Sequence, residues 1–298
     1  MEQWDDLRYF LAVARAGGLS SAARDLGVEA STVHRRIGQL EDRLSTRLFN
    51  RLPRGVRLTT AGQDLMKSME RVESEIFASE RRVLGHDASL AGVVRIAAAE
   101  DVASYLLTEI LLELRTKHPA ISLEIVIGNA RLSLSRGEAD IAIRIGGAQT
   151  HDPDVVARTV GELRGGLYAS EAYLERHGRP RRSRDLAGHA LVAGHGNLQA
   201  ISAPLEALIQ EPSSVYRADT VSHLAVATAA GFGIALLPCF IGPHFPTLTR
   251  LFPKLPLAMA PLWVLVHHEV RRAPRVQTTV QHLKEALQTR QVELEGRA

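Results

Sequence analysis

The sequence predicts a protein of the α + α/β class, with a small helical module, one long helix and a larger two-lobed α/β domain. Three observations predict it. Arginines and short helical patterns crowd the first 62 residues, an unbroken helical pattern runs from Thr60 to about Leu84, and strands alternate with helices from Gly92 onward. A length of 298 residues suits about two domains, and a hydrophobic content of 45% supports a sizeable core.

The net charge of +3 comes entirely from the N-terminal fifth of the chain. Residues 1–62 contain ten arginines, no lysine and seven acidic residues, whereas the remaining residues carry equal numbers of basic and acidic groups. A basic module joined to a neutral one predicts polyanion binding at one end and a separate task at the other.

The first two helices are predicted on either side of a glycine pair. Asp5 and Asp6 suit a helix N-terminus. An apolar stripe follows at three- and four-residue spacing, and the Gly17–Gly18 pair ends the helix. Ser20 or Ser21 is the expected N-cap of the second helix.

The third helix begins near Ala30 and carries an apolar stripe that ends at Leu44. Residues 47–59 then predict a two-stranded wing with a Pro-Arg-Gly tip. A helix, a glycine turn and a helix with a polar free face make a helix-turn-helix, whose second helix reads base edges. Arginines on a helix face are more often merely solvated, but here pattern, wing and local charge coincide. The candidate DNA-binding residues are Ser31, Thr32, His34, Arg35, Arg36, Gln39, Arg51 and Arg54.

Residues 9–62 resemble, without a gap, the winged helix-turn-helix of LysR-type transcriptional regulators. In that family the recognition helix has a Gln near its start, then a Ser and an Arg about one turn later. These positions are Ala30, His34 and Arg35 here. The resemblance also implies DNA contacts by Ser31 and by the wing residue Arg54. Because Ala30 cannot pair with adenine as Gln does, it implies the family's docking mode with an altered base preference.

The long helix carries a heptad-like seam, which is typical of a coiled coil. Its positions step by four and three: Leu65, Met69, Val72, Ile76, Ser79 and Val83. The resemblance implies a dimerising linker helix, and the alternative is a helix packed on its own domain. The predicted domains are therefore the winged helix-turn-helix at 1–59, the linker helix and its hinge at 60–88, and the effector-binding domain at 89–298.

From Gly92, strand–helix alternation predicts a parallel sheet with helices on its faces, and a second such unit begins near residue 158. Lobe I is predicted at 89–163 and 267–298, and lobe II at 164–266. This portion resembles the effector-binding domain of LysR-type regulators, which is similar to periplasmic binding proteins. The strongest pieces are "GEADIAIRIG", "YLERHGRPRRSRDLAGH" and "AAGFGIALLP".

Ligands in such folds lie where strand ends and helix N-termini face the crevice. This criterion selects Ala99, Glu100, Asp101, Gly128, Asn129, Arg144, Gly146, Ala193, Gly194, Asp219 and Thr220. The family often has Ser or Thr after the first strand, where Glu100 and Asp101 stand here. These acids would repel an anionic effector, or would merely cap the helix, whereas Arg144 favours an anion. The sequence leaves the effector's charge open.

No other chemistry is predicted. His267 and His268 are adjacent on an expected strand, so their side chains should point to opposite faces and not share a metal ion. No cluster at ligand spacing, nucleophile elbow or Walker loop occurs, so we expect no metal, no cofactor and no enzymatic activity. Cys239 lies in an apolar setting and is expected to be an inert buried thiol, with a redox switch as the alternative.

The sequence therefore predicts a sequence-specific transcriptional regulator of the LysR type, controlled by a small molecule bound between two lobes. Its expected partners are double-stranded promoter DNA, the effector, a second copy through the linker helix and, by the family's habit, a homotetramer. A single cysteine, no apolar run long enough to span a membrane and no secretory leader predict a cytoplasmic protein. The alternative function is an architectural DNA-binding protein that responds to no effector.

Overall fold

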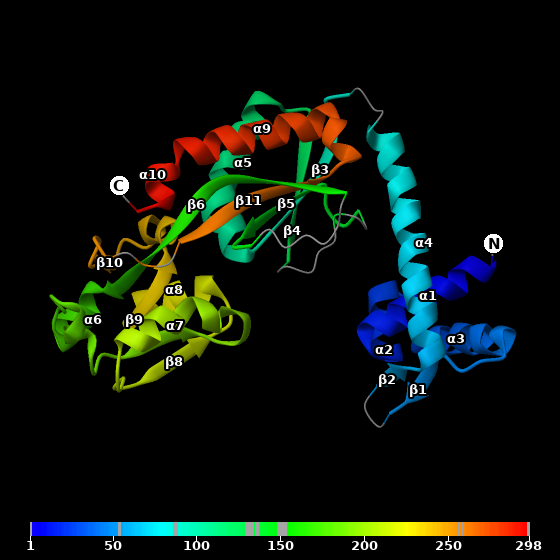
Figure 1. The fold of residues 1–298 in the computed structure, drawn as a ribbon, viewed down its shortest axis with the longest axis horizontal. Coiled ribbons are helices and arrows are strands. Elements are labelled where there is room, and N and C mark those ends of the chain that lie inside the picture. The colour runs from blue at the N-terminus through cyan, green and yellow to red at the C-terminus, as the bar shows by residue number, and fades with distance from the viewer. Residues whose placement is uncertain are drawn as a thin grey trace. The chain divides into compact units, whose positions relative to one another are not determined.

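The computed structural model describes the chain except residues 1, 53–54, 86–88, 129–133, 135–136, 148–153, 256, 258 and 297–298 (Figure 1). The chain forms two compact units, Met1–Ser79 and Glu80–Ala298. Among the described residues, no helix combines the length and the hydrophobicity of a membrane span.

The N-terminal unit is a helical bundle with a two-stranded wing. Phe10, Val13, Val33 and Leu40 are fully buried in its core, and the rings of Phe10 and Phe49 lie 5.3 Å apart, which ties the wing to the first helix. Its elements are α1 Glu2–Ala16, α2 Leu19–Leu26, α3 Ala30–Leu44, β1 Phe49–Arg51, β2 Val56–Leu58 and most of α4, which spans Thr60–Gly85 and continues past the unit's end at Ser79.

Two predicted helix starts are wrong. α1 begins at Glu2, about one turn before Asp5, and α2 is preceded by Gly18 in an extended conformation with no side-chain cap, so neither Ser20 nor Ser21 caps it. The predicted glycine turns are present, because Gly17 and Gly27 adopt φ values of +65° and +66°. Only glycine reaches this left-handed region without steric cost.

Close backbone approach holds the wing against the helices. Gly55 has φ +92°, and its neighbour Val56 donates its N–H to the Gly17 carbonyl at 2.9 Å. A Cβ at Gly55 would overlap that same carbonyl oxygen, and a Cβ at Gly62 would overlap the carbonyl oxygen of Leu48. Larger residues at Gly55 and Gly62 would therefore displace the wing or the start of α4.

The first half of α4 belongs to the core of its own unit. Met69 is 7% exposed within that core, and Leu65 and Val72 pack beside it. The prediction that Met69 lies in an intersubunit seam is therefore wrong, since Met69 satisfies the core of its own domain. Ile76 is different, because 51% of its surface is exposed. The side chain of Val83 lies outside the described residues.

The C-terminal unit is built on a mixed sheet with the strand order β4-β3-β5-β11-β6-β9-β7-β8, and β10 pairs with β6 (Figure 1). β3 runs parallel to β4 and β5, and β7 runs parallel to β8 and β9, whereas β11 and β6 are antiparallel to their neighbours. The predicted parallel sheet is thus only partly correct, because the chain crosses between lobes as strands. The strands are β3 Gly92–Ala98, β4 Ile121–Ile127, β5 Ile141–Ile145, β6 Val155–Ser170, β7 Leu191–Gly194, β8 Val215–Ala218, β9 Ile234–Pro238, β10 Leu248–Leu251 and β11 Met259–His267.

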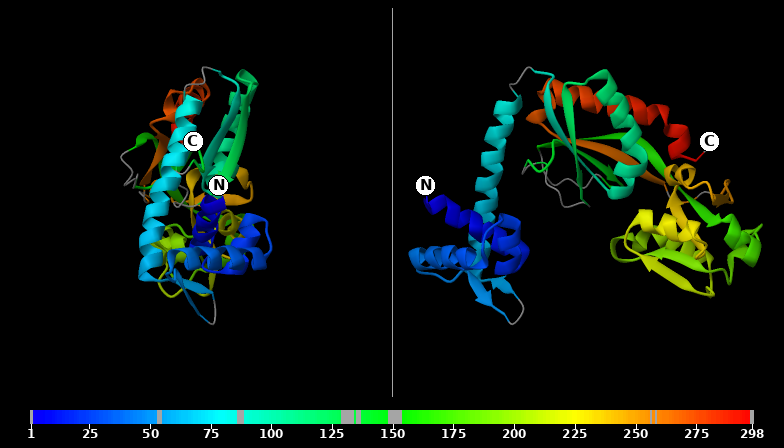
Figure 2. Two further views of the ribbon diagram at one scale, coloured as in Figure 1. Left: turned by 90° about the vertical axis from the view of Figure 1, so that its right-hand side faces the viewer. Right: turned by 180° about the vertical axis from the view of Figure 1, so that it is seen from behind.

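The strand β6 passes from lobe I into lobe II. Up to Arg164 it pairs with β11, and from Gly165 it pairs with β9 and β10. β11 pairs with both β5 and β6, so it belongs to the lobe I sheet. The chain has therefore re-entered lobe I by Met259, where β11 begins. The predicted boundary between lobe II and the C-terminal part of lobe I was later, at residue 267. Figure 2 shows β6 and β11 side by side as the green and orange strands.

Helices cover the sheet, and one apolar cluster runs through both lobes. Leu106, Leu114 and Leu283 of lobe I pack in the same buried cluster as Leu224 and Ala225 of lobe II. The helices are α5 Thr108–Lys117, α6 Glu171–His177, α7 Gln199–Leu208, α8 Val221–Ala229, α9 Pro274–Thr289 and α10 Gln291–Leu294. A π-helical turn at Val102–Leu107 precedes α5, and 3₁₀ turns lie at Ser183–Leu186, Gly196–Leu198, Cys239–His244 and Val270–Arg272.

Candidate functional site

The free face of α3 presents polar side chains, as the sequence predicts. Val33, Ile37 and Leu40 are buried. Thr32 is half-buried, and four candidate DNA-binding side chains are exposed: Ser31, His34, Arg35 and Gln39. Ser31, Arg35 and Gln39 are spaced by four residues, which places them on one helix face. This face offers hydroxyl, guanidinium and amide groups, which are the donors and acceptors that read base edges in the major groove.

Arg36 points elsewhere than the other candidate residues of α3. Its Nη1 donates to Asp6 Oδ1 at 3.2 Å, and its guanidinium lies 5.9 Å from the centroid of the Tyr9 ring. Asp6 is only 6% exposed and also pairs with Arg43 at 3.5 Å. The contacts of Arg36 therefore differ from the expected contact with DNA. They indicate a structural role, in which Arg36 holds α3 against α1.

Glu41 is a structural residue that sequence reasoning missed. Its buried carboxylate accepts hydrogen bonds from the amides of Leu48 at 2.7 Å and Phe49 at 3.2 Å, and from Arg47 at 2.9 Å. Burial alone would raise the pKa of Glu41, but these hydrogen bonds outweigh it and lower that pKa. The carboxylate thus anchors the first wing strand to the end of α3.

The two strands of the wing carry arginines. Arg57 is exposed on β2, opposite Asn50 of β1. Arg51 lies opposite Val56 in the same ladder, but its side chain is outside the described part of the chain, as is Arg54. The DNA contacts assigned to Arg51 and Arg54 remain predictions.

In the effector domain, Glu100 bridges the two lobes. It follows β3 and accepts hydrogen bonds from Ser104 Oγ at 3.1 Å and from Ser222 Oγ. Ser222 is in the first turn of α8, whose N-cap Thr220 accepts from the His223 amide at 3.3 Å. Sequence reasoning missed both serines, although Ser104 lies one helical turn after Glu100.

Asp101 has a different environment from Glu100. It is 6% exposed at the start of the π-helical turn. Burial raises the pKa of its carboxyl, opposed by hydrogen bonds from the backbone amides of Val102 and of Asp101 itself, and the neighbouring Glu100 carboxylate raises it further. The Asp101 side chain makes no hydrogen bond that caps the helix, and its own backbone is already helical at φ −63° and ψ −42°, so the capping role that the sequence left open is not confirmed. π-helical turns are often found at functional sites.

The remaining lobe I candidates lie at strand ends. Ala99 is half-buried against the core, and the Gly128 amide donates to the Ala98 carbonyl at 3.1 Å, beside the end of β3. Arg144 is half-buried next to the last residue of β5. The Gly146 carbonyl, at φ +92°, accepts from Trp263 Nε1 at 2.6 Å. Asn129 lies outside the described residues.

In lobe II the predicted set divides into structural and accessible residues. Ala193 is fully buried, and the Gly194 amide donates to Ser202 Oγ at 2.6 Å while its carbonyl accepts from Arg217 at 3.3 Å. These two positions hold the lobe together. Asp219 is exposed beside the cap residue Thr220, at the end of α8 that faces Glu100.

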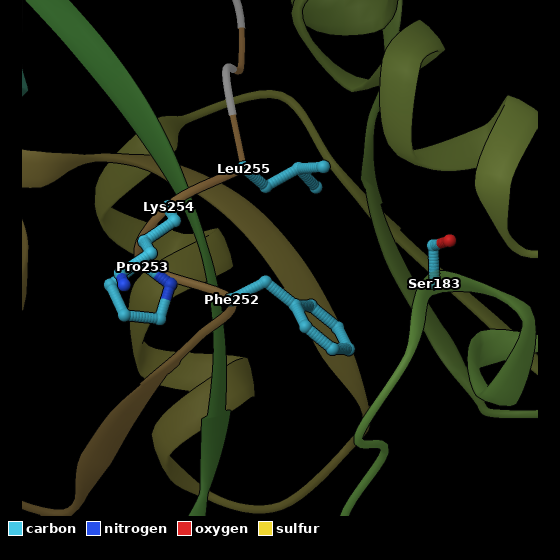
Figure 3. Close-up of a pocket in the computed structure, with 5 residues that line it drawn as sticks. All are labelled: Ser183, Phe252, Pro253, Lys254 and Leu255. Atoms are coloured by element: carbon cyan, nitrogen blue, oxygen red, sulfur yellow. The ribbon is translucent and has the colours of Figure 1, made fainter.

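A separate hollow on lobe II is not lined by any predicted effector residue. Its lining is Ser183, Phe252, Pro253, Lys254 and Leu255. In Figure 3 the side chains of Phe252 and Leu255 point toward Ser183. Phe252 has φ +48°, a conformation that is uncommon for an aromatic residue.

Two side-chain predictions outside these sites have different outcomes. Cys239 is 3% exposed, so its predicted burial is confirmed, and burial raises the pKa of its thiol although Arg250 and the Tyr168 hydroxyl oppose the shift. The predicted opposite orientation of His267 and His268 is wrong, because their ring centroids lie 4.9 Å apart. β11 ends at His267 and His268 begins a turn, so strand alternation no longer separates the two side chains.

Comparisons with known proteins identify the class to which this fold and these surfaces belong. The sequence model of the LysR substrate binding domain matches residues 87–288, and that of the bacterial regulatory helix-turn-helix protein, lysR family, matches residues 4–63. The chain belongs to the LysR family and is a DNA-binding transcriptional regulator of that type.

Individual relatives agree with this assignment. An HTH-type transcriptional regulator of Xanthomonas campestris pv. campestris is 33% identical over 189 residues, which are 63% of this chain but only 54% of that protein. The HTH-type transcriptional regulator CrgA of Neisseria meningitidis serogroup C is 28% identical over 257 residues, 84% of each chain. The full-length structure of the Vibrio cholerae virulence activator AphB is 22% identical, with a TM-score of 0.63 over 94% of this chain and 98% of that one, which shows a shared fold.

Proposed function

We propose that the protein binds promoter DNA sequence-specifically through α3 and the wing, in the cytoplasm, and that a small molecule bound between the lobes changes this binding. The observation that carries the DNA proposal is the exposed face of Ser31, His34, Arg35 and Gln39 on a helix fixed by the Asp6–Arg36 pair. A rigid helix with a polar free face is what base readout in the major groove requires.

We propose that α4 joins two copies through its second half. Ile76 is 51% exposed and Ser79 is also exposed, whereas Met69 is committed to the core. Two recognition helices related by a two-fold axis read half-sites separated by whole helical turns. A tetramer would pair two such dimers.

The test of DNA binding uses fluorescence anisotropy with the full-length protein. The probes are the DNA upstream of its own gene and a scrambled duplex of equal composition, at moderate ionic strength. We expect the protein to prefer its own upstream DNA by about 1,000-fold or more, because specific binding is typically roughly 10³–10⁷ times tighter than non-specific binding. The double variant Ser31→Ala, His34→Ala should lose the preference, and the control Arg271→Ala in lobe I should keep it. Equal affinity of the wild type for both duplexes would contradict the proposal of sequence-specific DNA binding.

We propose that the effector carries amine or hydroxyl groups rather than a carboxylate. The Glu100 carboxylate already lies at the start of α8, hydrogen-bonded to Ser222. The N-terminus of a helix favours a negative group, so Glu100 occupies the place that an anionic ligand would take. An ammonium or hydroxyl group of the effector could donate a hydrogen bond to this carboxylate, whereas an anionic group would be repelled by it.

A thermal-shift screen tests the effector proposal with matched amines, polyols and carboxylates. Hits among amines or polyols that disappear in Glu100→Gln, together with an altered DNase footprint, would support it. Hits confined to carboxylates would contradict the proposed charge of the effector, but they would not contradict the proposal that a small molecule controls DNA binding. A footprint unchanged by every compound would favour the alternative, an architectural DNA-binding protein without an effector.

A further inference from the structure

The structure brings two imidazoles and a carboxylate together where β6 begins and β11 ends. His267 lies opposite Val155 in the antiparallel ladder, and the His268 amide extends that ladder by donating to the Asp154 carbonyl at 2.7 Å. The sequence separates Asp154 from the histidines by more than a hundred residues, so only this strand pairing joins them. The cluster shares no residue with α3 or with the contacts of Glu100.

Ligand atoms of the three side chains lie near the spacing that a metal ion requires. One ligand atom from each of Asp154, His267 and His268 lies within 4.8 Å of the other two, and His268 Nδ1 is 3.5 Å from Asp154 Oδ1. Around a tetrahedral zinc ion with bonds of about 2.0–2.2 Å, neighbouring ligand atoms are roughly 3.3–3.6 Å apart. The Asp154–His268 distance already has this value.

The cluster combines one fixed ligand with two adjustable ones. His267 is 2% exposed, whereas the side chains of Asp154 and His268 are 58% and 48% exposed. Rotation of the two exposed side chains can therefore close the remaining separations around an ion. The backbone amide of Glu269 donates to His267 Nδ1 at 3.4 Å, and the Glu269 carboxylate lies 3.8 Å from the same nitrogen, so this imidazole is held in place by its neighbour.

We propose that Asp154, His267 and His268 bind a divalent transition-metal ion, and we assign Zn²⁺ as the ion. Two imidazoles with one carboxylate suit zinc, while magnesium and calcium prefer oxygen ligands throughout. Three protein ligands leave a coordination position for water or for Glu269. A simple histidine–aspartate ion pair is the competing explanation, but such an exposed pair stabilises little by itself.

The position of the site gives metal binding a structural consequence. β6 runs from this cluster into lobe II, where it pairs with β9 and β10, and β11 brings the chain back (Figure 2). An ion held by Asp154 and by both histidines would link the lobe I ends of these two crossing strands. Zinc would therefore be a second input to the effector domain, separate from the ligand near Glu100.

The experiment is a zinc titration of full-length protein that carries no polyhistidine tag and has been stripped with a chelator. We expect one Zn²⁺ per chain by calorimetry, a rise in melting temperature with zinc, and visible absorption typical of tetrahedral Co²⁺ when cobalt replaces it. His268→Ala and Asp154→Asn should each weaken zinc binding by ~10-fold or more. Both residues are exposed, so these variants should keep the fold, as their circular dichroism and melting without zinc would verify.

His244→Ala is the matched control, because His244 is an exposed histidine of lobe II. Its zinc affinity should equal that of the wild type. No zinc binding by the wild type, or equal binding by His268→Ala and Asp154→Asn, would overturn the proposed site and leave the histidine–aspartate ion pair as the explanation.

Discussion

The guanidinium of Arg36 donates to the buried carboxylate of Asp6 at 3.2 Å, joining the recognition helix to the first helix. Neutralising Asp6 would leave Arg36 without its acidic partner in a largely buried position. We expect Asp6→Asn to lower the free energy of unfolding of the N-terminal unit by about 1–3 kcal/mol. Calorimetry of the full-length protein measures this as a lower melting temperature of the N-terminal unit. An unchanged transition would show that the pair is energetically neutral.

Arg35 is expected to act on DNA affinity and not on stability. Its side chain is exposed on the face of Ser31 and Gln39. If Arg35 pairs with a guanine, Arg35→Ala should weaken specific binding by roughly 1–3 kcal/mol and relax the preference at one base pair. Anisotropy titrations with single-base operator variants measure both effects, with Lys67→Ala as an exposed cation control on α4. An isotherm identical to that of the wild type would take Arg35 out of the contact surface.

Glu41 makes the stability of the wing pH-dependent. Its pKa is lowered in the folded state, so its contribution to stability is present above the ordinary value of 4.5 and is lost as the pH falls through the lowered folded value. Glu41→Ala leaves the amides of Leu48 and Phe49 without their acceptor, which should cost about 1–3 kcal/mol near neutral pH.

Thermal unfolding of wild type and Glu41→Ala between pH 7 and pH 3 measures this contribution. The difference in stability should shrink as the pH falls, because the wild-type carboxylate becomes protonated. A difference that stays constant with pH would assign the effect to packing rather than to the carboxylate charge.

Substitutions at Met69 and at Ile76 should affect different properties, the stability of the N-terminal unit in the first case and dimer formation in the second. Met69→Glu buries a charge in the core and should destabilise the N-terminal unit by about 3 kcal/mol or more. Ile76→Glu, at a half-exposed position, should change stability by less than about 0.5 kcal/mol while it weakens the dimer. Sedimentation velocity at low concentration, alongside melting curves, distinguishes them. A fully dimeric Ile76→Glu would exclude this part of α4 from the interface.

Cys239 is expected to react slowly in the folded protein. Burial raises the pKa of its thiol, so little of the reactive thiolate exists at neutral pH. We expect an aromatic disulfide reagent to label native protein at least ~100-fold more slowly than unfolded protein. Fast labelling of the native state, or a covalent dimer that dithiothreitol reduces to monomers, would instead support the alternative that Cys239 is a redox switch.

Much of the architecture could be predicted because it is encoded locally. Periodic apolar residues such as Val33, Ile37 and Leu40 predict a helix and its buried face, and glycines such as Gly17 and Gly27 predict where helices end. The winged helix-turn-helix and the α/β effector domain are confirmed. The helix starts were less predictable, because an extended glycine replaced the expected side-chain cap before α2.

The candidate site was predicted less completely. Exposure of Ser31, His34, Arg35 and Gln39 follows from helix periodicity alone. Arg36 occupies a position that periodicity leaves open, and only its pairing with Asp6 shows that it holds the domain together. Likewise, strand-end reasoning selected Ala193 and Gly194, which the lobe II core requires for packing and hydrogen bonding.

The sequence by itself determined the class of this protein, the order of its elements and the polar face of α3, since these depend on neighbours within a few turns of the chain. Only the tertiary structure decided the partners of Asp6, Glu100 and Asp154. Arg36 is 30 residues from Asp6, and Ser222 is 122 residues from Glu100. Hydrogen bonds and metal sites require atoms to meet within a few ångströms, and for residues so far apart that distance is set by strand pairing and helix packing.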